Sequence, residues 1–324
     1  MTVFIIRRLM QSTVVMLVMS MIVFIGVYMI GNPVDILINP EATAEEIREV
    51  VRSLGLDQPI WYQYGRFLYN ALQGDLGESF VFGSPAIDLI FQRMPATLEL
   101  ASAAMLIAVV IGIPLGMWAG LRPTALTSRG IMAGSILGFS LPTFWIGLMM
   151  ILFFGVTLNW LPTGGRGETG ELIGIEFSFL TLDGLSHLLL PATNLALFKL
   201  ALVIRLTRAG TAEVIHQDYI KFAKAKGLSK QRILFVHVLK NILIPVITVL
   251  GLEFGNIVAF AVVTETVFAW PGMGKLIIDS MEVLDRPVIV AYLIVVVFMF
   301  ILINLVVDIL YSVLDPRVRL REVR

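Results

Sequence analysis

The sequence predicts an all-α integral membrane protein with six transmembrane helices, from its composition and from the grouping of its apolar residues. Hydrophobic residues make up 57% of the chain and charged residues only 15%, and the mean hydropathy is +0.88; soluble globular domains do not reach these values. The apolar residues form long uninterrupted runs, which fit helices rather than the alternating strands of a barrel, because backbone groups cannot stay unpaired in lipid. The six runs are Leu9–Ile30, Ala96–Leu121, Ile131–Val156, Leu188–Ile204, Ile242–Phe268 and Val288–Val313.

The first run is predicted to be an uncleaved span. Arg7 and Arg8 precede it, as basic residues precede a secretory signal. It contains about 22 residues, enough to cross roughly 30 Å of hydrocarbon, and no A-x-A type cleavage site follows it. Residues 1–30 are therefore expected to form a cytoplasmic N-terminus and the first transmembrane helix.

Residues 31–95 are expected to form a small helical cap on the outer face of the membrane. Ala44–Leu54 has a helical pattern, with Thr43 as its N-cap and Glu46 at the capping-box position three residues later. Gln58–Leu72 is rich in tryptophan, tyrosine and phenylalanine, which favour the membrane interface. Two later loops, near Leu161–His187 and Ala269–Pro287, are expected on the same side.

The distribution of basic residues predicts the orientation. Most of the 24 lysines and arginines fall before the first run, in the second and fourth connections, and in the tail 314–324. Cytoplasmic segments carry such an excess. Both termini and the stretch 211–240 are therefore expected to be cytoplasmic.

The stretch 211–240 is basic and largely polar, although long apolar runs lie on both sides of it. Gly227 is expected to end a short amphipathic helix, and Ser229 to cap a second helix leading into the fifth run. Three interpretations fit the pattern: a solvated basic loop, a helix lying on anionic lipid, and a helix that docks in a groove of another protein. The apolar side of the first helix is predicted to consist of Ile215, Tyr219, Phe222 and Ala223.

Polar side chains align within two of the predicted spans. Intramembrane ionisable groups usually face a bundle interior or water, so both sets are candidates for lining a pathway through the membrane. Hydrogen bonding between helices is the alternative. The fifth span carries Glu253, Asn256, Phe260 and Thr264, and the fourth carries Asn194, Phe198, Ala201, Arg205 and Arg208. A third set, Asn304, Asp308 and Tyr311, is interpreted as a structural pair with a basic residue.

Several kinds of chemistry are not expected in this chain. The absence of cysteine excludes disulfides, thiol nucleophiles and thiolate metal sites. Gly272–Lys275 does not complete a phosphate-binding loop, because Ala269 and Leu276 stand where glycine and serine or threonine are needed. The three histidines show no metal-ligand spacing, and a net charge of zero gives no reason to expect nucleic acid. The chain is thus expected to hold no catalytic site, metal or cofactor; an intramembrane hydrolase using Ser140 is the enzymatic alternative.

The stretch 211–240 resembles the cytoplasmic signature loop of ATP-binding cassette (ABC) importer permeases, in the branch for dipeptides, oligopeptides and nickel. The resemblance covers nearly the whole chain. Around the stretch, it is carried by Arg205, Thr207, Arg208, Glu213, Val214, Asp218–Ile220, Ala223, Ala225–Leu228, His237, Leu239, Asn241 and Pro245. Elsewhere it is carried by LGLDQP (54–59), GDLG (74–77), ATLEL (96–100), FSLPTFW (139–145), WLP (160–162), TETVFAWPGMG (264–274) and DPR (315–317).

Two positions depart from the family pattern. Lys221 stands where the wider importer signature has glutamate, six residues before Gly227, so no carboxylate contact is expected there. After the first span the branch usually has P-G-D-P, whereas this chain has Gly31, Asn32 and Pro33.

The resemblance implies a type I importer permease in a bacterial inner membrane, with residues 96–313 as its core domain of five spans. The implied partners are a second, non-identical permease subunit, two cytoplasmic subunits that bind ATP and Mg, and a periplasmic binding protein that delivers the substrate. The implied cargo is a dipeptide or oligopeptide. Nickel chelates and glutathione-like solutes are alternatives, as is a self-sufficient secondary transporter or channel, although no inverted repeat is evident.

The resemblance also assigns roles to residues. The short helix would be a coupling helix held in a cleft of an ATPase subunit, through Asp218, Tyr219, Phe222, Ala223, Ala225, Lys226, Gly227 and Leu228. The pathway candidates remain Asn194, Phe198, Glu253, Asn256, Phe260 and Thr264. Gating or packing roles are expected for Arg205, Arg208, Glu265 and Asp308.

Overall fold

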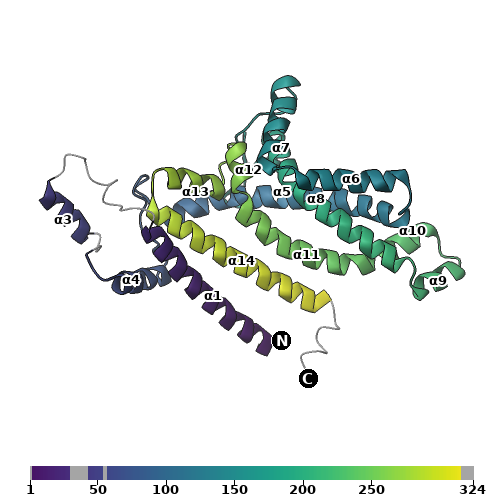
Figure 1. Cartoon of the computed structure of the whole chain (residues 1–324), viewed down its shortest axis with the longest axis horizontal. Helices are drawn as coiled ribbons and strands as arrows, with labels where there is room; N and C mark the ends of the chain where they lie inside the picture. Colours follow the sequence, from purple (N-terminus) through teal and green to yellow (C-terminus); the bar gives the residue numbers. More distant parts are fainter. Residues whose placement is uncertain (1, 30–42, 54–56, 315–324) are drawn as a thin grey trace. The chain divides into compact units, whose positions relative to one another are not determined.

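The computed structural model describes residues 2–29, 43–53 and 57–314, and these are mostly helical (Figure 1). Contacts divide the chain into two compact units. Unit 1 consists of Met1–Pro95 and Pro271–Ile301, and unit 2 consists of Ala96–Trp270 and Leu302–Arg324. Gly31–Pro33, where the chain departs from the family pattern, lies outside the described residues. The DPR segment, which supports the resemblance, also lies outside them.

Unit 1 is built from helices that lie near the two ends of the sequence. Its elements are α1 (Thr2–Met29), α3 (Ala44–Ser53), α4 (Ile60–Leu72), α13 (Met273–Glu282), the first residues of α5 (Ala86–Leu121) and most of α14 (Arg286–Leu314). The predicted capping box of α3 is confirmed: Thr43 N donates to Glu46 Oε2 at 2.7 Å, and Glu46 N donates to Thr43 Oγ1 at 3.4 Å.

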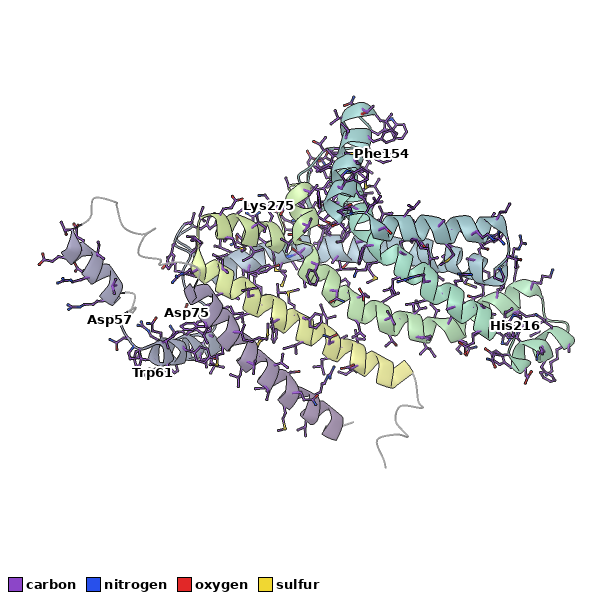
Figure 2. The ribbon with its side chains drawn as sticks, in the orientation of Figure 1. Asp57, Trp61, Asp75, Phe154, His216 and Lys275 are labelled. Atoms are coloured by element: carbon purple, nitrogen blue, oxygen red, sulfur yellow. The ribbon has the colours of Figure 1, made fainter. Side chains whose placement is uncertain are left out.

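Helix α4 packs against α1 through aromatic rings. The hydroxyl groups of Tyr64 and Ser20 lie 2.9 Å apart, and the Phe24 ring lies 5.5 Å from the rings of Tyr64 and Phe67. Trp61, on another side of α4, is exposed (Figure 2). An aromatic outer surface of this kind suits the membrane interface.

Unit 2 contains the remaining long helices and a short hairpin. Its main helices are the rest of α5, α6 (Leu126–Ser140), α7 (Thr143–Met150), α8 (Leu182–Val214), α9 (Asp218–Ala225), α11 (Leu239–Phe260), α12 (Val262–Val267) and the end of α14. Shorter elements are the π-helices η1 (Ile151–Thr157) and η3 (Ile233–Val238), the 3₁₀-helix η2 (Ser178–Leu180) and α10 (Lys230–Arg232). Strands β1 (Gly170–Leu172) and β2 (Ile175–Phe177) pair antiparallel, with Gly170 opposite Phe177.

Four helical stretches of the described chain are long and apolar enough to cross a membrane: Ala86–Leu121, Leu182–Val214, Lys230–Phe260 and Arg286–Ile309. They match the second, fourth, fifth and sixth predicted runs. The described part of α1 adds the shorter apolar helix Met10–Gly26. The fifth run extends to α12 only after an interruption at Ala261.

The third predicted run is not one straight helix. Leu126–Gly138 and Thr143–Thr157 are bent by 103° relative to each other, and together they would make a fifth span. Pro142 explains the break, because proline disfavours helical geometry at the residue before it. Leu141 is accordingly extended, with ψ 142°. Ser140 Oγ donates to Ile136 O at 2.8 Å, so this hydroxyl bonds within its own helix.

Helices α5 and α8 approach closely along a line of glycines. Gly112, Gly116 and Gly120 recur at intervals of four on α5. A Cβ atom on Gly116 would lie 2.6 Å from Thr207 Cβ and 2.8 Å from Ile204 O. Only glycine permits this separation, as at other small-residue contacts between membrane helices.

Candidate functional site

The predicted helix, glycine turn and second helix are present between α8 and α11. Helix α9 begins with Asp218 and carries Lys224 in its last turn, charges that complement the helix dipole. Gly227 has φ +74°, a conformation that side chains rarely adopt. Ser229 Oγ then accepts from Arg232 N at 3.3 Å and caps α10.

One side of α9 is buried within unit 2. Ile220 has no exposed surface, and with Ala223 it joins a cluster of apolar side chains that includes Met117 of α5 and Ile242 of α11. Leu228, after the turn, packs against the same cluster. The cluster fixes α9 to the ends of two long helices.

The residues predicted for the apolar side of this helix divide between two environments. Tyr219 is 43% exposed and Phe222 is 62% exposed, whereas Ala223 is buried. Adjacent residues on a helix point about 100° apart, so Ile220, next to Tyr219, turns toward the chain's own core. Ile220 was missed as a core residue, although its spacing of three from Ala223 indicates a shared face.

The outer side of α9 combines aromatic rings with lysines. Lys221 Nζ lies 2.8 Å from Asp218 Oδ1, and Lys226 Nζ lies 4.6 Å from the centre of the Phe222 ring. Partial burial raises the pKa of Tyr219 above its usual value, because desolvation disfavours the phenolate. Lys224 and Ala225 are exposed on the same helix. Figure 2 shows His216 at the junction that leads from α8 into this surface.

The structure brings together two pathway candidates from different predicted spans. Asn194 Nδ2 on α8 donates to Thr264 Oγ1 on α12 at 3.2 Å, and both residues are buried. The contact is a hydrogen bond between helices, which was the alternative to a pathway role. The interruption at Ala261 separates Thr264 from the rest of its predicted set.

The other pathway candidates lie on a partly exposed side of α8 and α11. Glu253 forms an ion pair with Lys199 of α8, a residue to which no role was assigned from sequence. Asn256 is half-buried one turn after Glu253, and Phe260 is 75% exposed. Phe198, on α8, is 36% exposed.

The gating or packing candidates occupy different environments. Glu265 is fully buried and accepts a hydrogen bond from Thr97 Oγ1 at 2.7 Å. Arg205 is exposed on α8, and Arg208 and Asp308 are half-buried on α8 and α14. Of these residues, Glu265 is the one whose burial and hydrogen bond favour a packing role.

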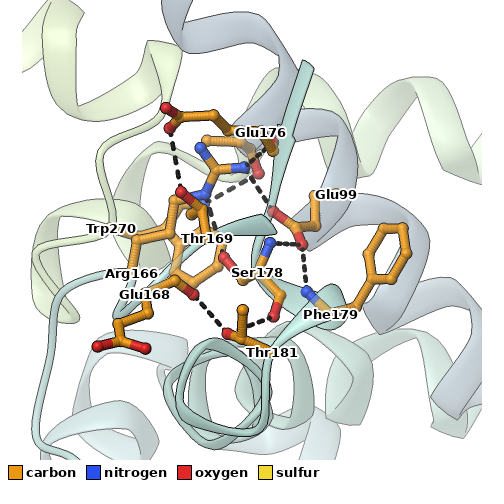
Figure 3. A network of polar contacts seen from close by, with 10 residues as sticks. Glu99, Arg166, Glu168, Thr169, Glu176, Ser178, Phe179, Thr181 and Trp270 are labelled. Atoms are coloured by element: carbon orange, nitrogen blue, oxygen red, sulfur yellow. Dashed lines mark hydrogen bonds and ion pairs between the residues drawn. The ribbon is translucent and has the colours of Figure 1, made fainter. Parts of the chain in front are cut away.

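A second buried carboxylate, Glu99, was missed by the sequence interpretation. It accepts from Arg166 Nη2 at 2.7 Å and from the backbone N–H groups of Ser178 at 2.6 Å and Phe179 at 3.0 Å (Figure 3). Arg166 also donates to Glu176 O at 2.6 Å. The network ties the hairpin loop to α5. An acidic residue within the apolar run after Pro95 was a signal that could have identified it.

The described ranges contain no group of three or more His, Asp or Glu side chains that could hold a metal ion.

Comparison with known proteins agrees with this architecture. Residues 112–320 match the family model of the binding-protein-dependent transport system inner membrane component, and residues 1–101 match the model of its N-terminal part. The chain is 40% identical over 302 residues to the di/tripeptide transport system permease protein DppB of Pseudomonas aeruginosa (strain UCBPP-PA14), covering 89% of this chain and 90% of that protein. It is 38% identical over 320 residues to the oligopeptide transport system permease protein AppB of Bacillus subtilis (strain 168), covering 98% and 99%.

A chain of the solved MetNI methionine ABC transporter, in inward facing conformations, has a similar fold. The TM-score is 0.53 at 16% sequence identity, over 70% of this chain and 96% of that chain. The chain therefore belongs to the family of binding-protein-dependent transport system inner membrane components, and it is a permease subunit of an ABC importer.

Proposed function

We propose that this permease forms half of the pathway by which an ATP-driven importer moves dipeptides or oligopeptides into the cell. The observation that carries the proposal is α9, a short helix fixed to the membrane helices on one side and exposing Tyr219 and Phe222 on the other. The peptide cargo rests on the names of relatives that align over almost their whole length.

The proposed assembly contains four further subunits. A second, related permease completes the pathway, two cytoplasmic subunits bind ATP and Mg, and a periplasmic binding protein delivers the peptide. In this assembly the chain has six spans, counting α1 and the bent pair α6 and α7. Residues 31–95 form the outer cap, 96–313 form the core domain, and both termini, including the tail 314–324, are cytoplasmic.

Helix α9 is proposed to be the coupling element. Tyr219 and Phe222 enter a cleft of the ATPase subunit, as the exposed rings of a docking helix enter an apolar groove. Asp218, Ala225 and Lys226 border the contact, and Gly227 and Leu228 hold the turn behind it. Because Ile220 and Ala223 are buried against α5 and α11, a displacement of α9 is transmitted to those helices. ATP then drives import by favouring one of two arrangements of the spans.

The pathway is proposed to follow the partly exposed side of α8 and α11. Phe198, Glu253, Asn256 and Phe260 line it, whereas Asn194 and Thr264 brace the helices behind it. Arg205, Arg208, Glu265 and Asp308 act in gating or in packing near the ends of the spans.

Purification of the tagged chain in mild detergent from its native membrane tests this assembly. The proposal expects a second permease and two ATP-binding subunits to co-purify with the chain in fixed ratio. A chain that purifies alone, and that transports solute in vesicles without ATP, would instead be a self-sufficient carrier.

A further inference from the structure

Lys199 and Glu253 place one positive and one negative group beside each other within two membrane helices. Lys199 lies near the middle of α8, and Glu253 lies on α11, seven residues before its end. Their side chains form an ion pair and are 11% and 23% exposed, respectively. Both helices are among the four stretches apolar enough to cross a membrane.

Lipid is a poor cover for this pair. A charged group within the hydrocarbon region is strongly disfavoured unless it faces a protein interior or water. Glu253 keeps a quarter of its side chain uncovered by its own chain, and the neighbouring Asn256 is also polar and half-buried. The exposed side of the pair therefore faces water or another polar surface in the assembled transporter.

The opposite side of α11 has a different character. There, Leu243, Ile247 and Phe254 line an apolar cavity of about 360 Å³ together with Met105 and Val109 of α5. Among the described residues that line this cavity, Thr248 carries the one polar side chain. Helix α11 therefore has one polar side, which carries Glu253 and Asn256, and one apolar side, which is compatible with lipid.

We infer that Lys199 and Glu253 form a subsite for the charged ends of a zwitterionic peptide, an inference that rests on the proposed function. A free peptide carries a carboxylate and an ammonium group. When the subsite is empty the two side chains neutralise each other, and when a peptide passes, the carboxylate meets Lys199 and the ammonium meets Glu253. Lys199 thus exchanges the carboxylate of Glu253 for that of the peptide, and Glu253 exchanges the ammonium of Lys199 for that of the peptide. No unpaired charge is left inside the membrane at either stage, which keeps the exchange favourable.

The geometry around Lys199 fits this exchange. Its ammonium group has three N–H donors, and one of them is directed at Glu253 Oε2. The ring of Phe198 lies 5.3 Å from Nζ and provides a cation–π contact on another side. Lys199 is thus held in place by α8 itself while its carboxylate partner changes.

The test uses the complete transporter, with its binding protein, in proteoliposomes. Uptake of a free dipeptide is divided by uptake of the same dipeptide as its C-terminal amide, for the wild type and for Lys199→Met/Glu253→Gln. The binding protein is the same in both, so its own preference cancels. The inference expects the ratio to fall about tenfold in the variant, because a hydrogen bond to a charged group is lost for the free acid alone. An unchanged ratio would overturn the inference, whatever happens to the absolute rate.

A matched control removes an ion pair on another helix. Lys275 Nζ and Asp279 Oδ1 lie 2.9 Å apart on α13, and Lys275→Met/Asp279→Asn is expected to leave the ratio unchanged. A wild-type transporter that imports neither peptide form would refute the proposed function itself, which separates the two failures.

If the Lys199→Met/Glu253→Gln variant fails to assemble, labelling of an introduced cysteine tests whether the ion pair lies on a polar surface. The chain contains no cysteine, so an introduced cysteine is the one thiol of this chain, and its labelling is read on this chain after the subunits are separated. Asn256→Cys is expected to react with a charged, water-soluble thiol reagent in the assembled transporter, and Ile247→Cys, on the apolar side, to remain unlabelled. Equal labelling of the two positions, or none at Asn256→Cys, would contradict a polar surface at the pair.

Discussion

At the scale of single residues, the buried pair of Glu99 and Arg166 holds the hairpin loop to α5. Glu99 is almost entirely buried, and Arg166 provides its charged partner. Arg166→Met leaves a carboxylate with only two backbone donors and no positive charge. Breaking a buried pair from one side costs about 3 kcal/mol or more, so we expect the denaturation midpoint of the detergent-solubilised protein to fall clearly.

Two variants control for this experiment. Arg129→Met removes an exposed arginine from α6 and should leave the midpoint nearly unchanged. Glu99→Gln/Arg166→Met removes both charges and should recover part of the loss. Equal midpoints for Arg166→Met and Arg129→Met would mean that the pair contributes little to stability.

The cap of α3 makes the protein locally sensitive to acid. The backbone hydrogen bond from Thr43, followed by that from its side chain, lowers the pKa of Glu46 below its usual 4.5. A lowered pKa means that the cap is fully formed above the ordinary pKa of glutamate, and that it is lost as the pH falls through the lowered value. Titration of a ¹³C-labelled Glu46 carboxyl should show the full shift in the wild type and in Thr43→Ser, and a smaller shift in Thr43→Ala, which keeps the backbone N–H but loses the side-chain hydroxyl. A shift of undiminished size in Thr43→Ala would exclude the Thr43 hydroxyl as one of its causes.

At the scale of elements, α9 has two faces with separable roles. Ile220 is fully buried, so Ile220→Ala should destabilise the chain itself by roughly 2–5 kcal/mol. Phe222 is mostly exposed, so Phe222→Ala should leave the unfolding midpoint unchanged and weaken co-purification with the ATP-binding subunits. Phe235→Ala, equally exposed but on η3, is the matched control. Normal co-purification of the Phe222→Ala transporter would place the ATPase contact elsewhere.

The elements differed in how well the sequence predicted them. Gly227 and Ser229 act on their immediate neighbours, and the turn and cap at these residues were predicted. Pro142 disfavours a continuous helix through the third predicted run, but the size of the bend between α6 and α7 depends on what each helix packs against. Which side of α9 is buried is decided by its packing against α5 and α11. A projection of one helix does not include these neighbours.

At the scale of the whole chain, composition and periodicity predicted the long apolar helices, while the polar contacts between them required the structure. Lys199 and Glu253 are 54 residues apart in sequence, and Glu99 and Ser178 are 79 apart. No local pattern pairs such residues, because helix rotation and crossing decide which side chains meet. Glu253 could therefore be recognised as unusual in its span, but its partner could not.

Helix rotation and crossing also divide the predicted pathway residues into two groups. Helical projection placed Thr264 with Glu253, although Ala261 interrupts the helix between them. Thr264 instead meets Asn194 in a buried hydrogen bond. Residues that share a projected face can thus have different roles: Thr264 joins two helices in a buried hydrogen bond, whereas Glu253 lies on a partly exposed surface.

This chain is proposed to transport only as part of an ATP-driven assembly. The most direct measurement is uptake of a radiolabelled dipeptide into proteoliposomes that contain the chain, its partner permease, both ATP-binding subunits and the binding protein. Uptake that requires ATP, and that is lost when any one component is omitted, is the expected result. Uptake by the chain alone, or uptake by the full set that is indifferent to ATP, would contradict it.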